Sequence, residues 1–582
     1  MLRNKFSLLA AALPLILAGF ALAGEPLPPA THWIPQQAVL SIELTNPKPL
    51  FDRVMDPAVV KAVEESPVYR EQAEKKGVRD FLGGVQFLEA SLGTSWQEAV
   101  RKLAGRGVTF AMWPDNKVAI IIDGEDAALL ARFHEIAVSI AKGEAEKSGN
   151  AQRVASADYR GVTGWTFNGE EAHAILGTRA IVTNNSKALK AVIDLCKDGD
   201  GSSLAKAASY QAAKKAAGTA NAMAYVDLAT LKQLPPFQKA LKGSENPLLS
   251  LLLSGVLDSL RTSNWLAVGA TVEGKQVAFS ATTDGKATTE MASFAQPDSP
   301  EKGILPNLDV PRRIAAVSLY RDLHGFYAAK DELFPERTSG LIFFENMMGI
   351  FFSGRDLTDE VLAETEPEVR LVVANQDYDS EVGTPKVQIP AFALVLRMAH
   401  PEKFALIAEE GWQKALGLVN FTRGQQGLPG LIIDRPEHGG VKYSIAYFST
   451  VDVKDKTDLE TRFNFRPALA RVNDYLVISS TDALTKDIIE ALQKGASADA
   501  KPAAGTHSLA EVDTSSIAAI LSANRENLVR NNMVEKGKTR EEAESETGGL
   551  IALLQYLGEA TLKIGSQDGL TRATLDLEPK LP

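Results

Sequence analysis

The chain has 582 residues, more than one hydrophobic core normally holds, so several compact regions are expected. Its apolar content of 45% and charged content of 23% are ordinary for a soluble globular protein. The net charge of −11, without a basic cluster, disfavours binding to nucleic acids and to anionic lipid headgroups.

Residues 1–23 have the three parts of a secretory signal peptide. Arg3 and Lys5 form the positive start, Leu8–Leu22 the apolar centre, and Ala21-Leu22-Ala23 a cleavage site. The apolar run is shorter than the ~20 residues that a membrane span requires. We therefore predict an exported protein, periplasmic or extracellular, with no integral membrane span. The alternative is tethering to the membrane by an uncleaved signal.

The first half of the mature chain mixes strand and helix patterns. A strand is predicted at Ala38–Leu44, and a hairpin joins Val108–Trp113 to Val118–Asp123 across a turn-rich linker. Leu130, Phe133, Ala137 and Ile140 then recur at helical spacing. Further elements follow in the order Tyr159–Val162, Ala174–Thr183, Ala188–Asp194, Ala224–Asp227, Leu248–Leu260, Leu266–Thr271 and Val277–Thr282.

The second half repeats these landmarks in the same order. Pro35-Gln36-Gln37, before the first strand, returns as Pro311-Arg312-Arg313 before Ile314–Tyr320. A helix is predicted to begin at Pro401, where a missing N–H group costs nothing. The remaining counterparts are Val369–Ala374, Phe392–Met398, Gly439–Val441, Tyr475–Ser479, Ala483–Ile489, Ala510–Asp513, Leu550–Leu557, Ala560–Ile564 and Thr571–Leu577.

This repetition predicts an α+β protein with two tandem, diverged repeats. Each repeat is expected to be a mainly antiparallel β-sheet with amphipathic helices packed on it. The predicted organisation is a signal peptide at 1–23, module 1 at 24–296, a linker at 297–310 and module 2 at 311–582. Residues 534–546 are expected to be an exposed helix or locally disordered.

Several of these motifs also resemble a known family. They are Tyr159-Arg160-Gly161-Val162, Ala188-Leu189 with Val192-Ile193-Asp194, and Ala224-Tyr225-Val226-Asp227-Leu228. In this order they are similar to a family of exported bacterial proteins catalogued as a domain of unknown function. The resemblance implies location and fold style and brings no assigned activity. The second copy departs from the pattern at Gly439-Gly440.

Catalytic motifs are matched only in part. Residues 269–275 begin like a phosphate-binding loop, but Gln276 stands where Ser or Thr should reach magnesium, so a β-turn fits better. The segment 134–138 lacks the second histidine of a zinc protease helix. Ser139–Lys142 and Ser203–Lys206 have the spacing of serine–lysine nucleophiles without the motifs that should follow.

The sequence contains no complete motif for a metal site or a reactive thiol either. Asp198–Ser202 and Asn375–Glu381 begin like calcium loops, but both lack the glycine and the glutamate that such loops need. Solvated acidic turns are the plainer interpretation. The only cysteine, Cys196, excludes an intramolecular disulfide and a cysteine-based metal cluster. It continues the apolar stripe of its helix, which predicts a buried, inert thiol.

Asp227 and Asp513 are the shared acidic residues most easily mistaken for catalysts. Each follows an Ala-x-Val strand and precedes a helical run. An aspartate at such a junction accepts hydrogen bonds from the first free N–H groups of the helix. We therefore predict that both are helix caps.

No catalytic, cofactor-binding or metal residue is assigned from the sequence, and no cofactor is expected. The leading interpretation is an exported, non-enzymatic protein that binds an unknown protein or an apolar ligand through sheet or cleft surfaces. The alternative is an exported hydrolase whose site is assembled from distant residues.

Overall fold

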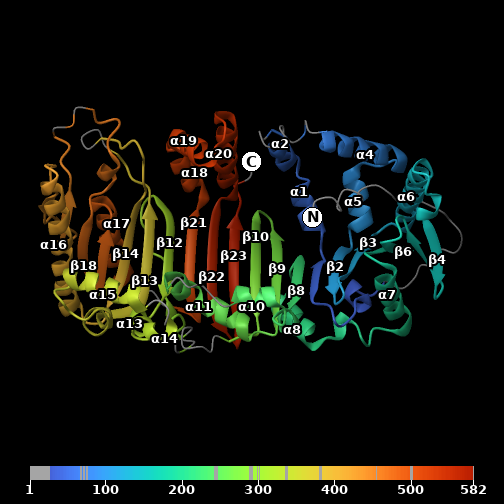
Figure 1. Cartoon of the computed structure of the whole chain (residues 1–582), viewed down its shortest axis with the longest axis horizontal. Helices are drawn as coiled ribbons and strands as arrows, with labels where there is room; N and C mark the ends of the chain where they lie inside the picture. The colour runs from blue at the N-terminus through green and yellow to red at the C-terminus, as the bar shows by residue number, and fades with distance from the viewer. Residues whose placement is uncertain are drawn as a thin grey trace. The chain divides into compact units, whose positions relative to one another are not determined.

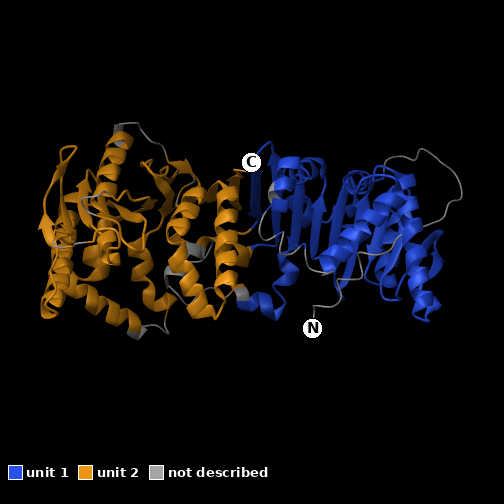
Figure 2. Cartoon of the chain, turned by 90° about the horizontal axis from the view of Figure 1, so that it is seen from above, with its two compact units in different colours: residues 1–239, 263–284, 582 blue, residues 240–262, 285–581 orange. Residues whose placement is uncertain are grey.

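The structure is a computed structural model that describes residues 27–65, 69, 73, 76–241, 247–286, 293–297, 299, 302–334, 338–378, 383–451, 453, 455–497 and 502–580. The predicted signal peptide, 1–23, lies outside these residues. The chain divides into two compact units (Figure 2). Unit 1 contains Met1–Lys239 and Ser263–Asp284, and unit 2 contains Ala240–Thr262 and Gly285–Leu581.

Unit 1 is built on an antiparallel sheet with the order β4-β5-β6-β7-β3-β2-β1-β8-β9-β10 (Figure 1). Its strands are β1 (Leu40–Leu44), β2 (Gly107–Trp113), β3 (Lys117–Asp123), β4 (Ala155–Tyr159), β5 (Val162–Thr166), β6 (Ala172–Leu176), β7 (Arg179–Thr183), β8 (Ala222–Asp227), β9 (Trp265–Glu273) and β10 (Gln276–Thr283). The predicted hairpins at 108–123 and 266–282 are confirmed as β2–β3 and β9–β10.

The helices of unit 1 fill the connections between its strands. They are α1 (Lys48–Val54), α2 (Pro57–Glu65), α4 (Lys76–Leu92), α5 (Trp96–Ala104), α6 (Ala127–Lys147), α7 (Ser186–Asp198), α8 (Ala208–Ala217), α9 (Leu228–Leu231) and most of α10 (Pro235–Leu241), whose last two residues are assigned to unit 2. Helix α7 packs through Leu189, Val192 and Ile193, all buried at the expected helical spacing.

Unit 2 has a second antiparallel sheet, with the order β17-β18-β19-β14-β13-β12-β21-β22-β23. Both β15 and β16 pair with β17. The strands are β12 (Arg313–Tyr320), β13 (Thr365–Ala374), β14 (Ala391–Met398), β15 (Ile432–Asp434), β16 (Glu437–His438), β17 (Val441–Tyr447), β18 (Ala468–Val472), β19 (Tyr475–Ser479), β21 (Thr506–Asp513), β22 (Glu559–Gln567) and β23 (Leu570–Glu578).

The helices of unit 2 include one from the first half of the sequence. They are α11 (Pro247–Thr262), α13 (Leu323–Ala328), α14 (Lys330–Leu333), α15 (Thr338–Phe351), α16 (Pro401–Gln425), α17 (Asp482–Ser497), α18 (Thr514–Ala523), α19 (Arg525–Lys536) and α20 (Arg540–Leu557). Pro401 occupies the first turn of α16, as predicted. The segment 534–546 forms the end of α19 and the capped start of α20.

The sheet of unit 2 is covered by helices on both faces. In β19, Leu476 packs with Phe404 of α16, whereas the next residue, Val477, packs with Ile488 of α17. Successive side chains of a strand point to opposite faces, so α16 and α17 cover opposite sides. Burial on both sides explains why two apolar residues, Leu476 and Val477, are adjacent in this strand.

The two units share one strand order. Read from β5 or from β17, each sheet passes through three successive strands and then a hairpin, β3–β2 or β14–β13. Next come β1 and β8, or β12 and β21, and the sheet ends on a C-terminal hairpin. An antiparallel α+β architecture is thus confirmed. Descent of the two units from one duplicated module stays a prediction.

The structure divides the chain differently from the expected modules 24–296 and 311–582. Helix α11 belongs to unit 2, where Leu251 packs with Phe326 and Phe334. Part of the expected linker 297–310 is also integral to unit 2. There β11 (Gly303–Ile304) pairs with β20 (Ala503–Ala504). Leu308 and Val310 enter its core. The expectation of a linker rested on the overall composition of this segment, which did not indicate that its few apolar residues are buried.

None of the helices in the described ranges combines the length and the apolar composition needed to cross a membrane.

Candidate functional site

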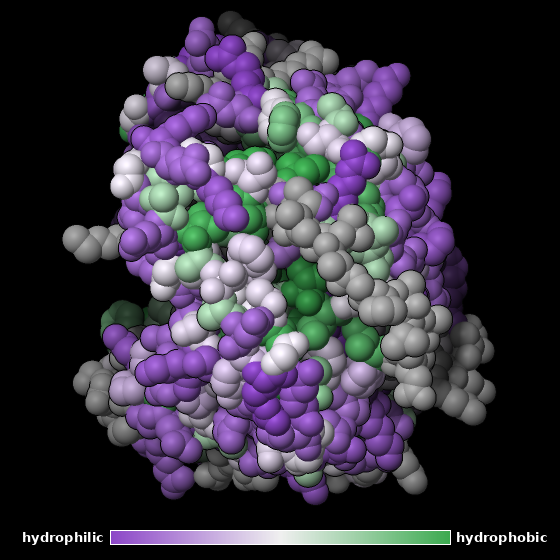
Figure 3. Space-filling model, turned by 90° about the vertical axis from the view of Figure 1, so that its right-hand side faces the viewer, coloured by the Kyte–Doolittle hydropathy of each residue, from purple (hydrophilic) through white to green (hydrophobic). Residues whose placement is uncertain are grey.

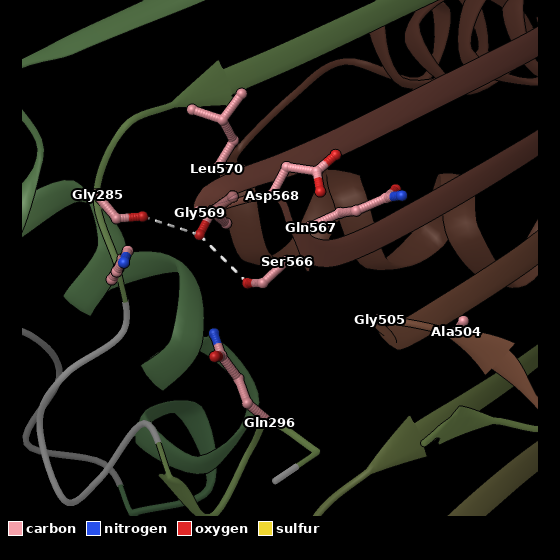
Figure 4. A pocket seen from close by; sticks show the side chains of 11 residues that line it. Gly285, Gln296, Ala504, Gly505, Ser566, Gln567, Asp568, Gly569 and Leu570 are labelled. Carbon is pink, nitrogen blue, oxygen red and sulfur yellow. Dashed lines mark hydrogen bonds between the residues drawn. The ribbon is translucent and has the colours of Figure 1, made fainter. Parts of the chain in front are cut away.

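Unit 2 contains a cavity of about 570 Å³ beside the turn that joins β22 to β23 (Figure 4). It is lined by Gly285, Lys286, Gln296, Ala504, Gly505, Ser566, Gln567, Asp568, Gly569, Leu570 and Thr571. One hydrogen bond across it joins residues 286 positions apart in the sequence. Because the lining comes from such distant stretches, no local motif marks this site.

One wall of the cavity is a tight hairpin turn. Asp568 and Gly569 have φ values of 53° and 76°, both in the left-handed region. Gln567 pairs with Leu570 across the turn. A two-residue turn with two positive φ values favours the dipeptide Asp-Gly, so the local sequence fixes this wall.

The opposite wall approaches β22 closely at Gly505. Its φ is +66°, and a Cβ atom there would lie 2.7 Å from the carbonyl oxygen of Ser566. The Ser566 N–H donates to the Gly505 carbonyl at 2.9 Å. A side chain at position 505 would therefore push the two walls apart.

Hydroxyl groups hold the floor of the cavity together. The Thr571 hydroxyl donates to the carbonyl of Gly285 at 3.1 Å and lies 2.8 Å from the hydroxyl of Ser259 in α11. The Gln296 side chain points toward this group in Figure 4. Its Nε2 atom is buried without a hydrogen-bond partner among the described residues. An orphaned buried donor is costly and suits a ligand acceptor.

A Ser–His contact also lies in unit 2, and it is the arrangement that a hydrolase would need. His507 Nδ1 lies 3.0 Å from the Ser508 hydroxyl, which also accepts a hydrogen bond from Arg321. Burial, together with the Arg321 charge, lowers the pKa of His507 to about 3. Both side chains are buried. An imidazole that weakly basic is a poor general base at neutral pH.

A second buried polar group lies in unit 1, between α6 and the β5–β6 hairpin. The rings of His134 and His173 are 5.3 Å apart, and His134 also contacts Trp165. Both imidazoles are buried, and neither Nε2 atom has a partner among the described residues. Burial, helped by the nearby His134, lowers the pKa of His173 to about 4, so the pair is neutral at neutral pH.

The Tyr-Arg-Gly-Val motif is a structural clamp. Arg160 and Gly161 form the two-residue turn between β4 and β5, both with positive φ. The Tyr159 hydroxyl donates to Asp194 of α7 at 3.0 Å, and Arg160 pairs with Asp194 and Asp198. The hairpin is thereby tied to the helix that follows it.

Unit 2 makes the corresponding connection with different residues. Gly439 and Gly440 form the turn between β16 and β17. His438, placed like Tyr159, lies 2.9 Å from Glu490 of α17. The departure of the second half from the family motif therefore changes the side chains and keeps the contact.

Asp227 and Asp513 are helix caps, as predicted. The Asp227 carboxylate accepts a hydrogen bond from the Thr230 N–H at 3.0 Å, at the start of α9. Asp513 accepts one from the Ser515 N–H at 3.0 Å, at the start of α18.

Replacing Asp513 by Ala should lower the stability of unit 2 by ~1 kcal/mol, because α18 loses its capping acceptor. Chemical denaturation of the full chain measures this, with Asp309→Ala as a control, since Asp309 is exposed. An unchanged midpoint together with altered ligand binding would show that Asp513 is a functional residue.

The motifs that resembled phosphate and calcium loops are also structural. Gly274 has a φ of 59° in the turn between β9 and β10, so the β-turn interpretation is confirmed. Asp198 pairs with Arg160, and Asp200 pairs with Lys206. Asp379 and Glu381 lie outside the described residues. In the described ranges, no three His, Cys, Asp or Glu side chains are placed to hold a metal ion.

Cys196 is half-buried rather than fully buried. Burial raises the pKa of its thiol, which lowers the fraction of reactive thiolate at neutral pH.

Comparisons with known proteins identify a family for the first half of the chain. A family model described as a protein of unknown function (DUF3352) matches residues 7–306. No curated protein matches the chain. Among solved structures, crystal form III of TP0453 matches at 8% identity and a TM-score of 0.23 over 44% of this chain and 80% of that one. Crystal form IV matches at 9% and 0.23, over 44% and 79%. These scores are too low to transfer a fold or a function.

Proposed function

The chain belongs to the DUF3352 family of proteins of unknown function, and from that premise we propose that it is an exported, non-enzymatic protein that binds an apolar partner protein. The observation that carries the proposal is the outer face of α15. Phe343 and Ile350 are 71% and 66% exposed there, and Ile342, Phe344 and Met347 are also exposed.

This face is built into the helix. Positions 343, 347 and 350 follow the helical repeat, so their side chains form one stripe. The helix has a single charged residue, Glu345, which pairs with Lys330 at 3.1 Å. The inner side is already anchored, because Leu341 and Met348 pack on the core of unit 2. The outer stripe is thus surplus to folding.

Unit 1 has a similar helix in the same place along its chain. Helix α4 lies between β1 and β2, as α15 lies between β12 and β13, and exposes Phe81 and Phe87 by 59% and 54%. Figure 3 shows a side of unit 1 on which apolar side chains gather in the middle and polar ones cover the margins. Clustered exposure of this kind is typical of interaction surfaces.

A protein partner fits the α15 stripe better than a lipid surface does. The chain carries a net charge of −11, and α15 contains no Lys or Arg to contact anionic headgroups. Burying each large apolar side chain fully against a partner gains roughly 1.5–3 kcal/mol, so covering this stripe favours association. The predicted signal peptide supports the proposal that the complex forms outside the cytoplasm.

The test places a photo-reactive phenylalanine analogue at position 343 in the native cell envelope. The control position is 553, since Leu553 on α20 is similarly exposed at 56%. We expect cross-linking to an apolar segment of one protein from 343 and not from 553. A synthetic copy of that segment should bind the purified chain, and Phe343→Ser with Ile350→Ser should weaken it at least tenfold. Cross-links to lipid alone, or equal products from both positions, would contradict the proposal.

A further inference from the structure

The cavity beside the β22–β23 turn continues into a second one of about 270 Å³. The two share Ala504, Gly505, Ser566, Gln567, Asp568 and Leu570 in their linings. We call the joined space the basic groove, because Lys286 lines the first cavity and Lys563 and Arg572 line the second. None of its lining residues belongs to α15, so a function of this groove can be tested independently of the proposed partner surface.

The register of the hairpin puts two of these cations on one face. Lys563 pairs with Thr574, and Gly565 pairs with Arg572. Cross-strand partners share a face, as do residues two apart on one strand, so Lys563 and Arg572 stand on the same side of the hairpin. Between them, Gly565 contributes no side chain. A Cβ atom there would lie 2.5 Å from the Gly505 carbonyl oxygen, so this gap is built into the backbone.

The charge of the groove differs in sign from that of the chain. The chain has 73 acidic and 62 basic residues, whereas the groove has three cations and one carboxylate, Asp568. Within the part of the chain that the structure describes, neither Lys286 nor Lys563 takes part in an ion pair. Three cations against a single carboxylate give the groove a net positive charge, which attracts an anion.

The remaining polar atoms suit the uncharged part of such a ligand. The buried Nε2 of Gln296 is a donor without a described partner, and it belongs to a side chain that points into the cavity (Figure 4). The Ser566 hydroxyl lies on the same wall, 3.4 Å from that of Thr571. The cavity of about 570 Å³ falls in the size range of small-molecule sites.

We infer that the basic groove of unit 2 binds a small organic oxyanion, with its carboxylate or phosphate group at Lys563 and Arg572 and its polar body beside Gln296. No catalytic step is involved, because the groove presents donors and cations without a nucleophile held by a base. The shared chemistry of carboxylate and phosphate oxygens explains why both are accepted.

Isothermal titration of the full chain with citrate and, separately, glycerol 3-phosphate tests this inference. Lys563→Gln with Arg572→Gln should weaken binding of the better probe at least tenfold. Lys239→Gln with Lys275→Gln changes the net charge equally at exposed positions of unit 1 and should weaken it less than twofold. Gln296→Leu alone should also weaken binding of this probe. Added to Lys563→Gln with Arg572→Gln, it should have no further effect, because the Gln296 donor acts on a ligand that the two cations hold.

The outcomes separate the two ligand classes and the null result. Preference for citrate identifies a carboxylate ligand and preference for glycerol 3-phosphate a phosphate ligand, and either supports the inference. The same probe should raise the melting temperature of the parent chain and leave that of the doubly substituted groove variant unchanged. Absence of binding to both probes at millimolar concentration, or an equal loss in the control variant, would overturn it.

Discussion

Replacing Arg179 by Met should destabilise unit 1 by about 3 kcal/mol, because the substitution leaves a partly buried carboxylate without its cation. The Arg179 side chain is 2% exposed, and its Nε lies 2.6 Å from Oδ1 of Asp123. Its Nη2 reaches Oδ2 of the same residue at 3.0 Å and the Pro28 carbonyl at 2.6 Å. The guanidinium also stacks over Trp33, 4.2 Å from the ring centre.

Arg160 provides a matched control in the same unit. It too pairs with aspartates, but its side chain is 36% exposed and its partners lie at the surface. Arg160→Met should therefore cost less than about 1 kcal/mol. Urea denaturation of each variant measures the difference. Adding Asp123→Asn to Arg179→Met should recover part of the loss, because the uncompensated charge is removed. An equal loss of unfolding free energy for Arg179→Met and Arg160→Met would show that the buried ion pair contributes no more to stability than the exposed one.

A chain that begins at Gly303 should be less stable than one that begins at Ala240, by about 3 kcal/mol. The longer chain keeps α11, whose Leu251 is 8% exposed and packs with Phe326 and Phe334. It also keeps Phe294, which packs against the same cluster. Losing two such apolar contacts costs on the order of 1.5–3 kcal/mol each, reduced where burial is partial.

Thermal and urea unfolding of the two chains measure this difference. Leu251→Asp in the longer chain serves as the control, since it places a charge in the cluster and should remove most of the gain. Identical unfolding of the longer and shorter chains would mean that α11 adds nothing to unit 2. The modules would then be independent at the linker that the sequence predicts.

Features set by neighbouring residues could be predicted from the sequence. The β2–β3 and β9–β10 hairpins, the proline start of α16 and the caps at Asp227 and Asp513 each depend on a few consecutive residues. The family was also identified from short ordered motifs, and the family model over residues 7–306 confirms it. Export and duplication have no such test here and stay predictions.

Features set by distant contacts could not be predicted. Ser259 and Thr571 meet across 312 positions, and nothing near either residue indicates the other. The expected linker 297–310 contains Ile304, Leu308 and Val310, whose side chains are buried, the last two in the core of unit 2. The Asp568-Gly569 dipeptide was a readable turn signal, but its role as a cavity wall depends on Gly505, which comes from another strand pair.

Helix α11 also imposes an order on events during synthesis. Its residues leave the ribosome between those of β8 and β9, and the sheet of unit 1 has all its strands once Thr283 has emerged. Phe326 and Phe334 follow later, and Thr571 appears 312 residues after Ser259. At about 5–20 residues per second, that last partner arrives tens of seconds later. Throughout this interval α11 is made but its Leu251 lacks its final contacts, so the growing chain carries an apolar segment that must be kept from docking elsewhere until unit 2 is complete.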